Sequence, residues 1–239
     1  MTELLMKYVE KYLVINQTCE DLAAKIAMNR VFYLDPGSTL QKHLGQSGEF
    51  LFTPFRLPKL SQKDVMDIYD VCNVFEGGGT KTFPPSRTRS QAFDLTLTGI
   101  RTDLHFEYQG LFPLVCECKK LGTDTKFDFE KLTLELKDSL DAIISDGWKP
   151  CEVFGILVSD DHGEVFVAEL KAESIYFMWK LGTLVRPKDH TEMLYTLLNN
   201  MPILLDLDLR MTSTLDALVK RSEKDIKCWP RPSFELPRQ

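Results

Sequence analysis

The segment Thr102-Asp-Leu-His-Phe-Glu-Tyr-Gln-Gly-Leu-Phe-Pro-Leu-Val-Cys-Glu-Cys-Lys119 has the pattern of two β-strands joined near Gly110. In the first strand the apolar residues Leu104, Phe106 and Tyr108 alternate with polar ones, as one half-buried strand requires. The second strand begins near Leu114. Pro113 has no N–H to donate, which suits a bulge or a sheet edge. The segment therefore predicts an antiparallel hairpin.

Three charged side chains meet on one face of this predicted hairpin. A turn centred on Gly110 pairs residues that are equally far from it, so Asp103 stands opposite Glu117. Directly opposed residues place their side chains about 5 Å apart on the same face. Lys119 is two residues beyond Glu117 and shares that face, as does His105. The pattern predicts two carboxylates and an ammonium in one patch.

Two carboxylates at this distance repel each other unless a positive charge neutralises them. Carboxylate oxygens suit Mg²⁺ or Mn²⁺, which would also bind a phosphate and activate a water. Lys119 would stabilise developing charge or position that water. A surface ion pair of little energetic value is the alternative, and the spacing leaves both interpretations open.

Hydrophobic periodicity predicts further elements on either side of the hairpin. Helical spacing covers residues 61–75 and 127–145, and Gly147 and Pro150 end the second helix. Strands are predicted over 93–98, 153–159 and 164–170. Further helices are predicted over 3–14, 18–29, 173–180, 189–199 and 206–222, and residues 36–58 are predicted to be rich in loops.

The order of these elements predicts an α/β fold with a central mixed sheet that includes the antiparallel hairpin and is flanked by helices. Residues 1–60 are expected to form an N-terminal helical extension and residues 61–172 the α/β core. Residues 173–239 are expected to form C-terminal helices packed on the core, followed by a loose tail.

In Asp103, Glu117-Cys118-Lys119 and the element order over residues 62–170, the chain resembles the PD-(D/E)xK nuclease superfamily, which has the restriction-endonuclease-like fold. Thr102 stands where that family often has proline. The resemblance implies that Asp103, Glu117 and the backbone carbonyl of Cys118 bind Mg²⁺ or Mn²⁺. It also implies that Lys119 orients the attacking water and that cleavage leaves a 5′-phosphate.

The resemblance also implies further site residues from the two neighbouring helices. An additional acid from the preceding helix would be Asp70 or Glu76, and a lysine from the following helix would be Lys131. Each of the three has the alternative of an ordinary solvated helix residue. The segment before the first core strand has no acids and offers phosphate contacts through Lys81, Arg87 and Arg89. Lys120, just after the motif, would add to them.

Composition limits the classes of function. The chain has 239 residues, 44% of them hydrophobic, and a formal net charge of −6, which argues against a general nucleic-acid coating protein. Its six cysteines are scattered, and the N-terminal residues do not resemble a signal peptide. We expect an intracellular protein, cytoplasmic or nuclear, without a membrane-spanning segment.

Two functions remain as hypotheses. The first is a divalent-metal-dependent nuclease, an endonuclease or exonuclease that hydrolyses phosphodiester bonds. The family resemblance favours DNA over RNA as its substrate. The second is a catalytically inactive nuclease-like fold that serves as a protein-interaction or nucleic-acid-binding module. The acidic net charge favours the second hypothesis, and the opposed carboxylates favour the first.

Overall fold

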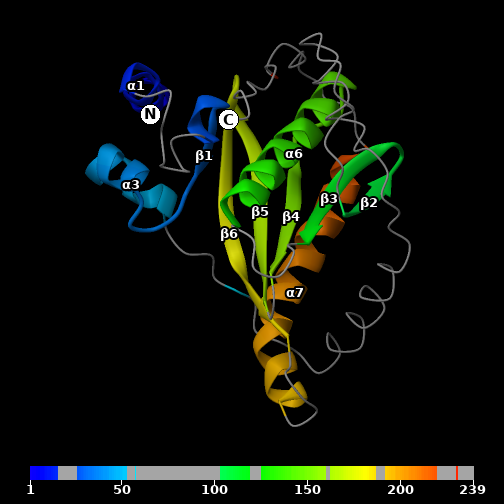
Figure 1. The fold of residues 1–239 in the computed structure, drawn as a ribbon. Helices are drawn as coiled ribbons and strands as arrows, with labels where there is room; N and C mark the ends of the chain where they lie inside the picture. The colour runs from blue at the N-terminus through cyan, green and yellow to red at the C-terminus, as the bar shows by residue number, and fades with distance from the viewer. Residues whose placement is uncertain are drawn as a thin grey trace.

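The computed structural model describes residues 1–15, 26–52, 57, 103–118, 125–159, 162–186, 192–219 and 230. These residues form a six-stranded mixed sheet with helices on both faces (Figure 1). The α/β class and the mixed sheet are therefore as predicted. The predicted helix over 61–75 and the predicted strand over 93–98 lie outside the described residues.

Strand order in the sheet is β1-β6-β5-β4-β3-β2. The strands are β1 (Val31–Tyr33), β2 (Leu104–Tyr108), β3 (Leu111–Cys118), β4 (Glu152–Ser159), β5 (His162–Ala172) and β6 (Ile175–Val185). β1 runs parallel to β6 and β3 parallel to β4, and the other neighbours are antiparallel. The helices are α1 (Thr2–Ile15), α3 (Thr39–Leu44), the 3₁₀ helix η1 (Gly45–Phe52), α6 (Thr125–Ser145) and α7 (Met193–Ala217).

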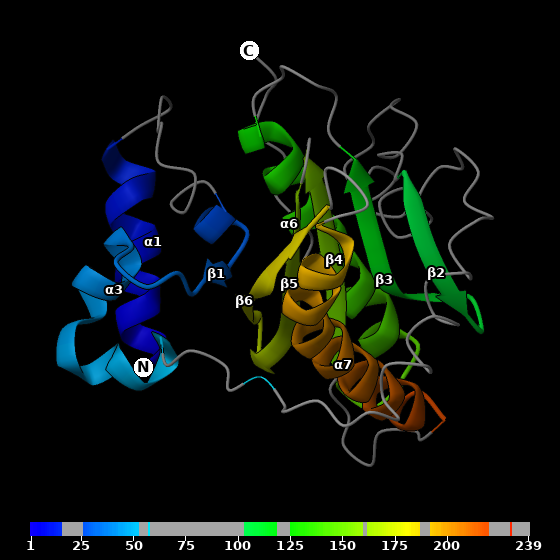
Figure 2. The ribbon, with the colours of Figure 1, turned by 90° about the horizontal axis from the view of Figure 1, so that it is seen from below.

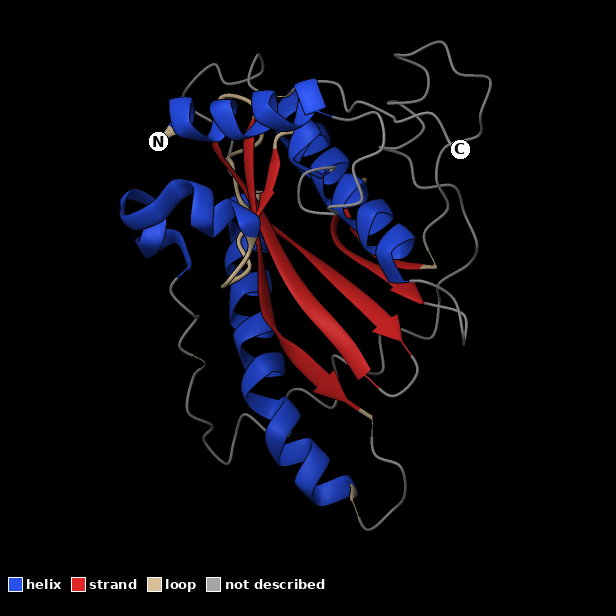
Figure 3. Cartoon of the chain, turned by 60° about the vertical axis from the view of Figure 1, so that its left-hand side comes forward, coloured by secondary structure: helices blue, strands red, loops and turns tan. Residues whose placement is uncertain are grey.

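Helices α6 and α7 cover opposite faces of the sheet (Figure 3). Because side chains alternate along a strand, Val115 of β3 joins the core under α6 whereas Leu114 joins the core under α7. Seen from below, α1 and α3 lie beyond the β1 edge, and β2 forms the other edge (Figure 2). No described helix combines the length and the hydropathy needed to cross a membrane.

The predicted hairpin is confirmed, and so is its register. Leu104 pairs with Cys116 and Phe106 with Leu114, the pairs that were predicted, although next to the turn Tyr108 pairs with Leu111. Gln109 and Gly110 both have positive φ, 53° and 79°, which is the geometry of a two-residue hairpin turn. The register shifts near Pro113, where β3 has one residue more than β2, so the expected bulge is present.

The crossover from β3 through α6 to β4 positions the candidate site. Parallel pairing of β3 with β4 starts at Leu114, just after Pro113, and runs to Cys118. Parallel neighbours need such a connection, and α6 supplies it across one face. The observed bounds of α6, β4 and β5 agree with the predicted ranges to within a few residues. The end of β3 and the first turns of α6 consequently lie close together.

The prediction for residues 173–180 is wrong, because they belong mostly to strand β6 and not to a helix. Ser174, with φ 58°, makes the tight turn after β5, and the aromatic run from Tyr176 to Trp179 then pairs along β5. Aromatic and β-branched residues fit a pleated, buried surface better than a helix. The predicted helices over 189–199 and 206–222 also differ from the structure, which has one helix, α7, with Pro202 inside it.

The N-terminal region also differs in part from its prediction as a helical extension. It contributes α1, α3 and η1, but β1 within it joins the sheet beside β6. The region predicted to be rich in loops contains α3, which begins where the Ser38 hydroxyl accepts a hydrogen bond from the Gln41 N–H at 3.3 Å. A serine at this position satisfies a helix-terminal N–H, so α3 has a local cause.

Replacing Gly155 of β4 by valine should lower the free energy of unfolding by about 1–3 kcal/mol. A Cβ at this position would lie 2.9 Å from Leu136 Cδ1 and 3.1 Å from Leu132 Cδ1, so these two buried side chains would have to shift. The same substitution at Gly163, where an added Cβ has no neighbour closer than 3.6 Å, should cost less. Urea unfolding of the two variants measures the difference, and an equal loss at both positions would contradict the close approach of α6.

Candidate functional site

Asp103 lies at the end of the hairpin where Glu117 stands in the neighbouring strand. The pairing of β2 with β3, continued one residue beyond Leu104, places Asp103 opposite Glu117. The Cys118 N–H donates a hydrogen bond to Asp103 Oδ2 at 2.6 Å. This bond, to a carboxylate, fixes the Asp103 side chain against the end of β3. The structure thus brings together the two acids that the sequence placed opposite each other.

Glu117 is a buried acid that faces α6. It is only 3% exposed and, two residues from Val115, projects from the same face of β3. Lys131 of α6 donates a hydrogen bond to Glu117 Oε2 and makes an ion pair with it. Lys131 was predicted as a candidate from the helix after the third strand, and the structure places its ammonium on Glu117.

Glu135 is a third acid at this place, and the sequence analysis did not select it. It lies one helical turn after Lys131, and its Oε1 is 3.9 Å from Lys131 Nζ. Its side chain is fully buried, at 0% exposure. Residues four apart share one side of a helix, so the Lys131–Glu135 spacing was a usable signal. The sequence could not show that this side of α6 lies over Glu117.

Several carboxylate oxygens in this cluster have no donor. Among the described residues, neither oxygen of Glu135 and only one of the two oxygens of Glu117 has an N–H or hydroxyl donor, and the carboxyl groups of Glu117 and Glu135 contact each other. Buried polar atoms are ordinarily satisfied, because an unsatisfied one forfeits its interaction with water. The cluster of Glu117, Lys131 and Glu135, together with Asp103, is called the acidic cluster below.

Burial raises the pKa of both inner acids. The pKa of Glu117 is raised by burial and by the charge of Asp103, although the hydrogen bond and the charge of Lys131 lower it. The pKa of Glu135 is raised well above its ordinary value, first by burial and next by the charge of Glu117. Both carboxyl groups therefore keep their protons to a higher pH than an exposed glutamate does, even with Lys131 beside them.

The cysteines beside Glu117 belong to a different environment. Cys116 is a direct neighbour of Glu117 in β3, so its buried side chain points to the opposite face of the sheet. Cys118 is exposed. The pKa of the Cys118 thiol is lowered by its hydrogen bond with Cys116, while the same contact and burial raise the pKa of Cys116. Cys118 contributes its backbone N–H to the cluster, through the bond to Asp103.

The donor atoms of the acidic cluster are of the type that binds Mg²⁺ or Mn²⁺, which prefer carboxylate and carbonyl oxygens. The described residues contain no group of three His, Cys, Asp or Glu side chains already arranged around one metal position. An ammonium occupies the cluster instead, because Lys131 Nζ contacts Glu117 and lies within 4 Å of Glu135. In this structure the cluster therefore accepts the single positive charge of Lys131.

Several predicted site residues lie outside the described part of the chain: Asp70, Glu76, Lys81, Arg87, Arg89, Lys119 and Lys120. Their roles stay predictions. His105, which was expected on the face of the carboxylates, pairs with Val115 in the neighbouring strand. Its ring stacks edge-on against Phe112, with 5.0 Å between the ring centroids. This contact gives His105 a packing role in the hairpin.

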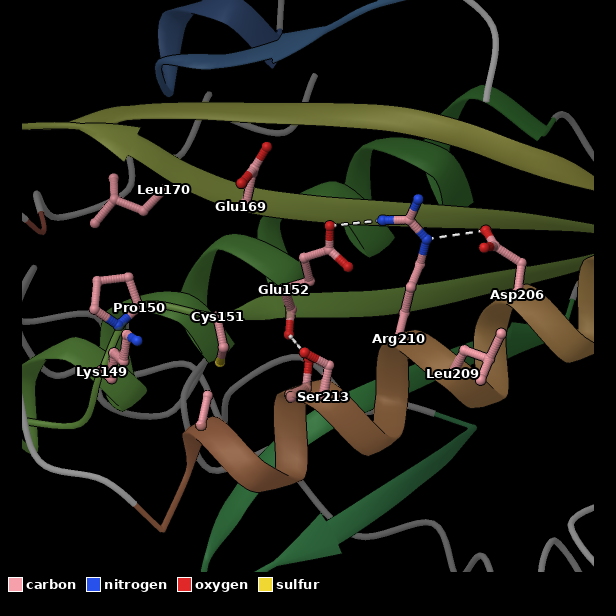
Figure 4. A pocket seen from close by; sticks show the side chains of 12 residues that line it. Lys149, Pro150, Cys151, Glu152, Glu169, Leu170, Asp206, Leu209, Arg210 and Ser213 are labelled. Atoms are coloured by element: carbon pink, nitrogen blue, oxygen red, sulfur yellow. Dashed lines mark hydrogen bonds and ion pairs between the residues drawn. The ribbon is translucent and has the colours of Figure 1, made fainter. Parts of the chain in front are cut away.

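A separate pocket of about 540 Å³ lies between α7 and the strands β4 and β5 (Figure 4). Arg210 of α7 projects into it and binds Glu152 at 2.7 Å and Asp206 at 2.9 Å. The Thr214 hydroxyl donates to the Glu152 carbonyl at 3.0 Å, which ties α7 to the start of β4. Two carboxylates already engage the Arg210 guanidinium, so this pocket is a poor phosphate site.

Comparisons of the chain with protein-family models, with curated proteins and with solved structures gave no match.

Proposed function

We propose that this protein is a divalent-metal-dependent nuclease that hydrolyses phosphodiester bonds and prefers DNA to RNA. One observation carries the proposal: the hydrogen bond from the Cys118 N–H to Asp103 Oδ2 holds Asp103 beside the buried Glu117. The order β2, β3, α6, β4 around this pair supports a restriction-endonuclease-like core. The nucleic-acid partner and a cytoplasmic or nuclear location are parts of the same proposal.

Asp103, Glu117 and the carbonyl of Cys118 would hold Mg²⁺ or Mn²⁺. The ion, when bound, supplies an activated water and a positive charge for the phosphate. Burial between β3 and α6 restricts the Glu117 carboxylate, and the backbone of β3 orients Asp103. Such orientation before binding is what a phosphoryl-transfer site needs.

The remaining roles follow the family pattern. Lys119 would orient the attacking water and stabilise the charge that develops on the phosphate. Lys131 neutralises Glu117 in the absence of a cation. Lys81, Arg87, Arg89 and Lys120 would contact phosphates on either side of the cleaved bond. The family pattern also offers Asp70 or Glu76 as an additional acid.

A non-catalytic module is the second candidate, and one observation favours it. The Lys131 ammonium gives Glu117 a partner within the chain, so part of its charge is neutralised without a metal. A nuclease-like fold that has lost its chemistry would keep such a pair. In that case the protein would act through binding to protein or nucleic acid.

Cleavage assays separate the two candidates. Purified protein with Mn²⁺ should cleave single- or double-stranded DNA, and EDTA should abolish the cleavage. Replacement of Glu117 by glutamine, Asp103 by asparagine or Lys119 by alanine should each lower the rate by at least about 100-fold, as loss of one electrostatic group does in other active sites. RNA substrates in the same assay determine the preference.

The control is Glu169→Gln, which removes one carboxylate from the opposite face of the sheet, beside the α7 pocket. This variant should cleave at the wild-type rate. If the wild type cleaves no DNA or RNA with Mn²⁺ or Mg²⁺, or if the Glu117 variant cleaves as fast as the wild type, the nuclease proposal fails.

A further inference from the structure

Ser159 and His162 form a hydrogen-bonded pair at the turn between β4 and β5. Ser159 is the last residue of β4 and His162 the first residue of β5, and the two are partners across the hairpin. Ser159 Oγ lies 3.1 Å from His162 Nε2. Neither residue belongs to the acidic cluster, and none of the roles proposed above uses either side chain.

The register of the sheet places this pair on the face that carries Glu117. Glu117 pairs with Leu157 in the parallel strand β4, and Leu157 belongs to the core under α6. Because side chains alternate along a strand, Ser159 projects from the same face, two residues nearer the end of β4. His162 is the partner of Ser159 and shares its face. The pair therefore lies at the carboxyl ends of the parallel strands, where ligands of open α/β sheets commonly bind.

The spacing of the strands gives the separation between this pair and the candidate site. Strands lie about 4.8 Å apart and residues rise about 3.3 Å along a strand, so the Cα atoms of His162 and Glu117 are roughly 12 Å apart. A nucleic-acid strand with one phosphate at Asp103 and Glu117 would carry a nearby phosphate past His162. Glu164, two residues after His162 on the same face, makes an ion pair with Lys180, which neutralises its charge toward a phosphate.

The two side chains differ in exposure. Ser159 is 6% exposed, whereas His162 is half-buried. A buried hydroxyl that bonds one ring nitrogen fixes the orientation of an imidazole. An imidazole N–H is a hydrogen-bond donor, and its bond to a charged phosphate oxygen is stronger than a bond to a neutral acceptor. The pair thus holds an oriented donor group beside the candidate site.

We infer that His162 donates a hydrogen bond to a phosphate of the bound nucleic acid, close to the phosphodiester that is cleaved, and that Ser159 is a positioning residue for its imidazole. The inference rests on the proposed function and adds a substrate contact from the β4–β5 hairpin. The contact forms when the strand binds, so it is tested without cleavage.

Binding of fluorescein-labelled single-stranded DNA, followed by fluorescence anisotropy, tests the contact. The full chain is titrated in EDTA, and again with Mn²⁺ in the Lys119→Ala background, in which cleavage is expected to be slow. His162→Ala should weaken binding by at least about 10-fold, the value of a hydrogen bond to a charged group. His162→Phe keeps an aromatic ring without an N–H and should lose as much. The matched control is His43→Ala, which changes a histidine of α3, beyond the β1 edge, and should bind as the wild type does.

A change in the substrate separates a direct contact from a loss of packing. Replacing one phosphate at a time by an uncharged methylphosphonate should weaken wild-type binding at each contacted phosphate. At one position this loss should disappear in His162→Ala and shrink in Ser159→Ala, because the contact is already absent or misplaced there. If the losses in the wild type and in His162→Ala agree at every phosphate, His162 makes no phosphate contact and the inference is overturned.

The outcomes distinguish this inference from the proposed function. If the wild type cleaves DNA while both His162 variants bind it as the wild type does, the inference alone is overturned. If His162→Ala abolishes the effect of one methylphosphonate but the wild type cleaves neither DNA nor RNA, the phosphate contact stands and the nuclease proposal fails. If the chain binds no nucleic acid with or without Mn²⁺, both are overturned.

Discussion

Replacing Asp141 of α6 by alanine should lower the free energy of unfolding by about 3–5 kcal/mol, because the substitution removes the carboxylate that pairs with the buried ammonium of Lys137. Lys137 is 1% exposed, and its Nζ contacts Asp141 Oδ2 at 2.5 Å. The hydroxyl of Tyr176 in β6, itself buried, donates to the other oxygen of Asp141. One carboxylate therefore satisfies two buried partners.

The geometry of this group explains the size of the expected loss. Lys137 Nζ also lies 4.8 Å from the centroid of the Tyr176 ring, so the ammonium is surrounded by protein. Burial raises the pKa of Asp141, whereas Lys137 and Tyr176 lower it. Truncation of Asp141 removes both of its hydrogen bonds and leaves a desolvated ammonium.

Urea unfolding of Asp141→Ala, Lys137→Met and the double variant Lys137→Met/Asp141→Leu measures this effect. Replacing both charges by apolar residues should restore much of the stability that Asp141→Ala loses, since a buried ion pair costs desolvation that an apolar pair does not. A loss below about 1 kcal/mol for Asp141→Ala would be the value of an exposed pair and would contradict the burial of Lys137.

Replacing Lys131 by methionine should lower the free energy of unfolding by about 3 kcal/mol near neutral pH, because it removes the ammonium that pairs with Glu117 and lies 3.9 Å from Glu135. Methionine keeps most of the apolar volume of the lysine stem. The matched control is Lys7→Met, which breaks an ion pair whose partners are 59% and 81% exposed. That change should cost less than about 0.5 kcal/mol.

The loss in Lys131→Met should grow as the pH rises. The pKa of Glu117 and of Glu135 is raised in the folded chain, and Lys131 lowers both, so its removal raises them further. An acid whose pKa is higher in the folded than in the unfolded chain stabilises the fold by binding a proton. This contribution is complete below the unfolded-state pKa, about 4.3 for glutamate, and is lost as the pH rises through the folded-state pKa. The variant should therefore be close to wild type near pH 4 and deficient at pH 8.

Unfolding curves of Lys131→Met at several pH values check this dependence, and a pH-independent deficit would show that lost packing is the cause. Excess Mn²⁺ should also stabilise this variant more than the wild type, because the cation no longer competes with an ammonium. That last result depends on the proposed metal site, whereas the pH dependence does not.

Local patterns in the sequence were sufficient for the hairpin and the helix that follows it. Gly110, the alternation on its N-terminal side and the bulge near Pro113 together give the register of β2 and β3, in which Asp103 lies opposite Glu117 as predicted. The apolar stripe of α6 and its stop near Gly147 gave that helix its bounds. These features depend on residues that are close together in the chain.

Tertiary structure decided the parts that depend on distant partners. Residues 175–185 form a strand because β5 lies beside them, and Val31–Tyr33 form one because β6 does, although neither segment was predicted as a strand. A strand is completed by hydrogen bonds to a neighbour that the local sequence does not reveal.

The candidate site combines both kinds of information. The sequence by itself predicted that Asp103 and Glu117 face each other, and the structure reaches this register through the two-residue turn at Gln109 and Gly110 together with the bulge near Pro113. Only the tertiary structure decided that Lys131 and Glu135 lie over Glu117, because the rotation of α6 about its axis is set by which of its sides packs on β3 and β4.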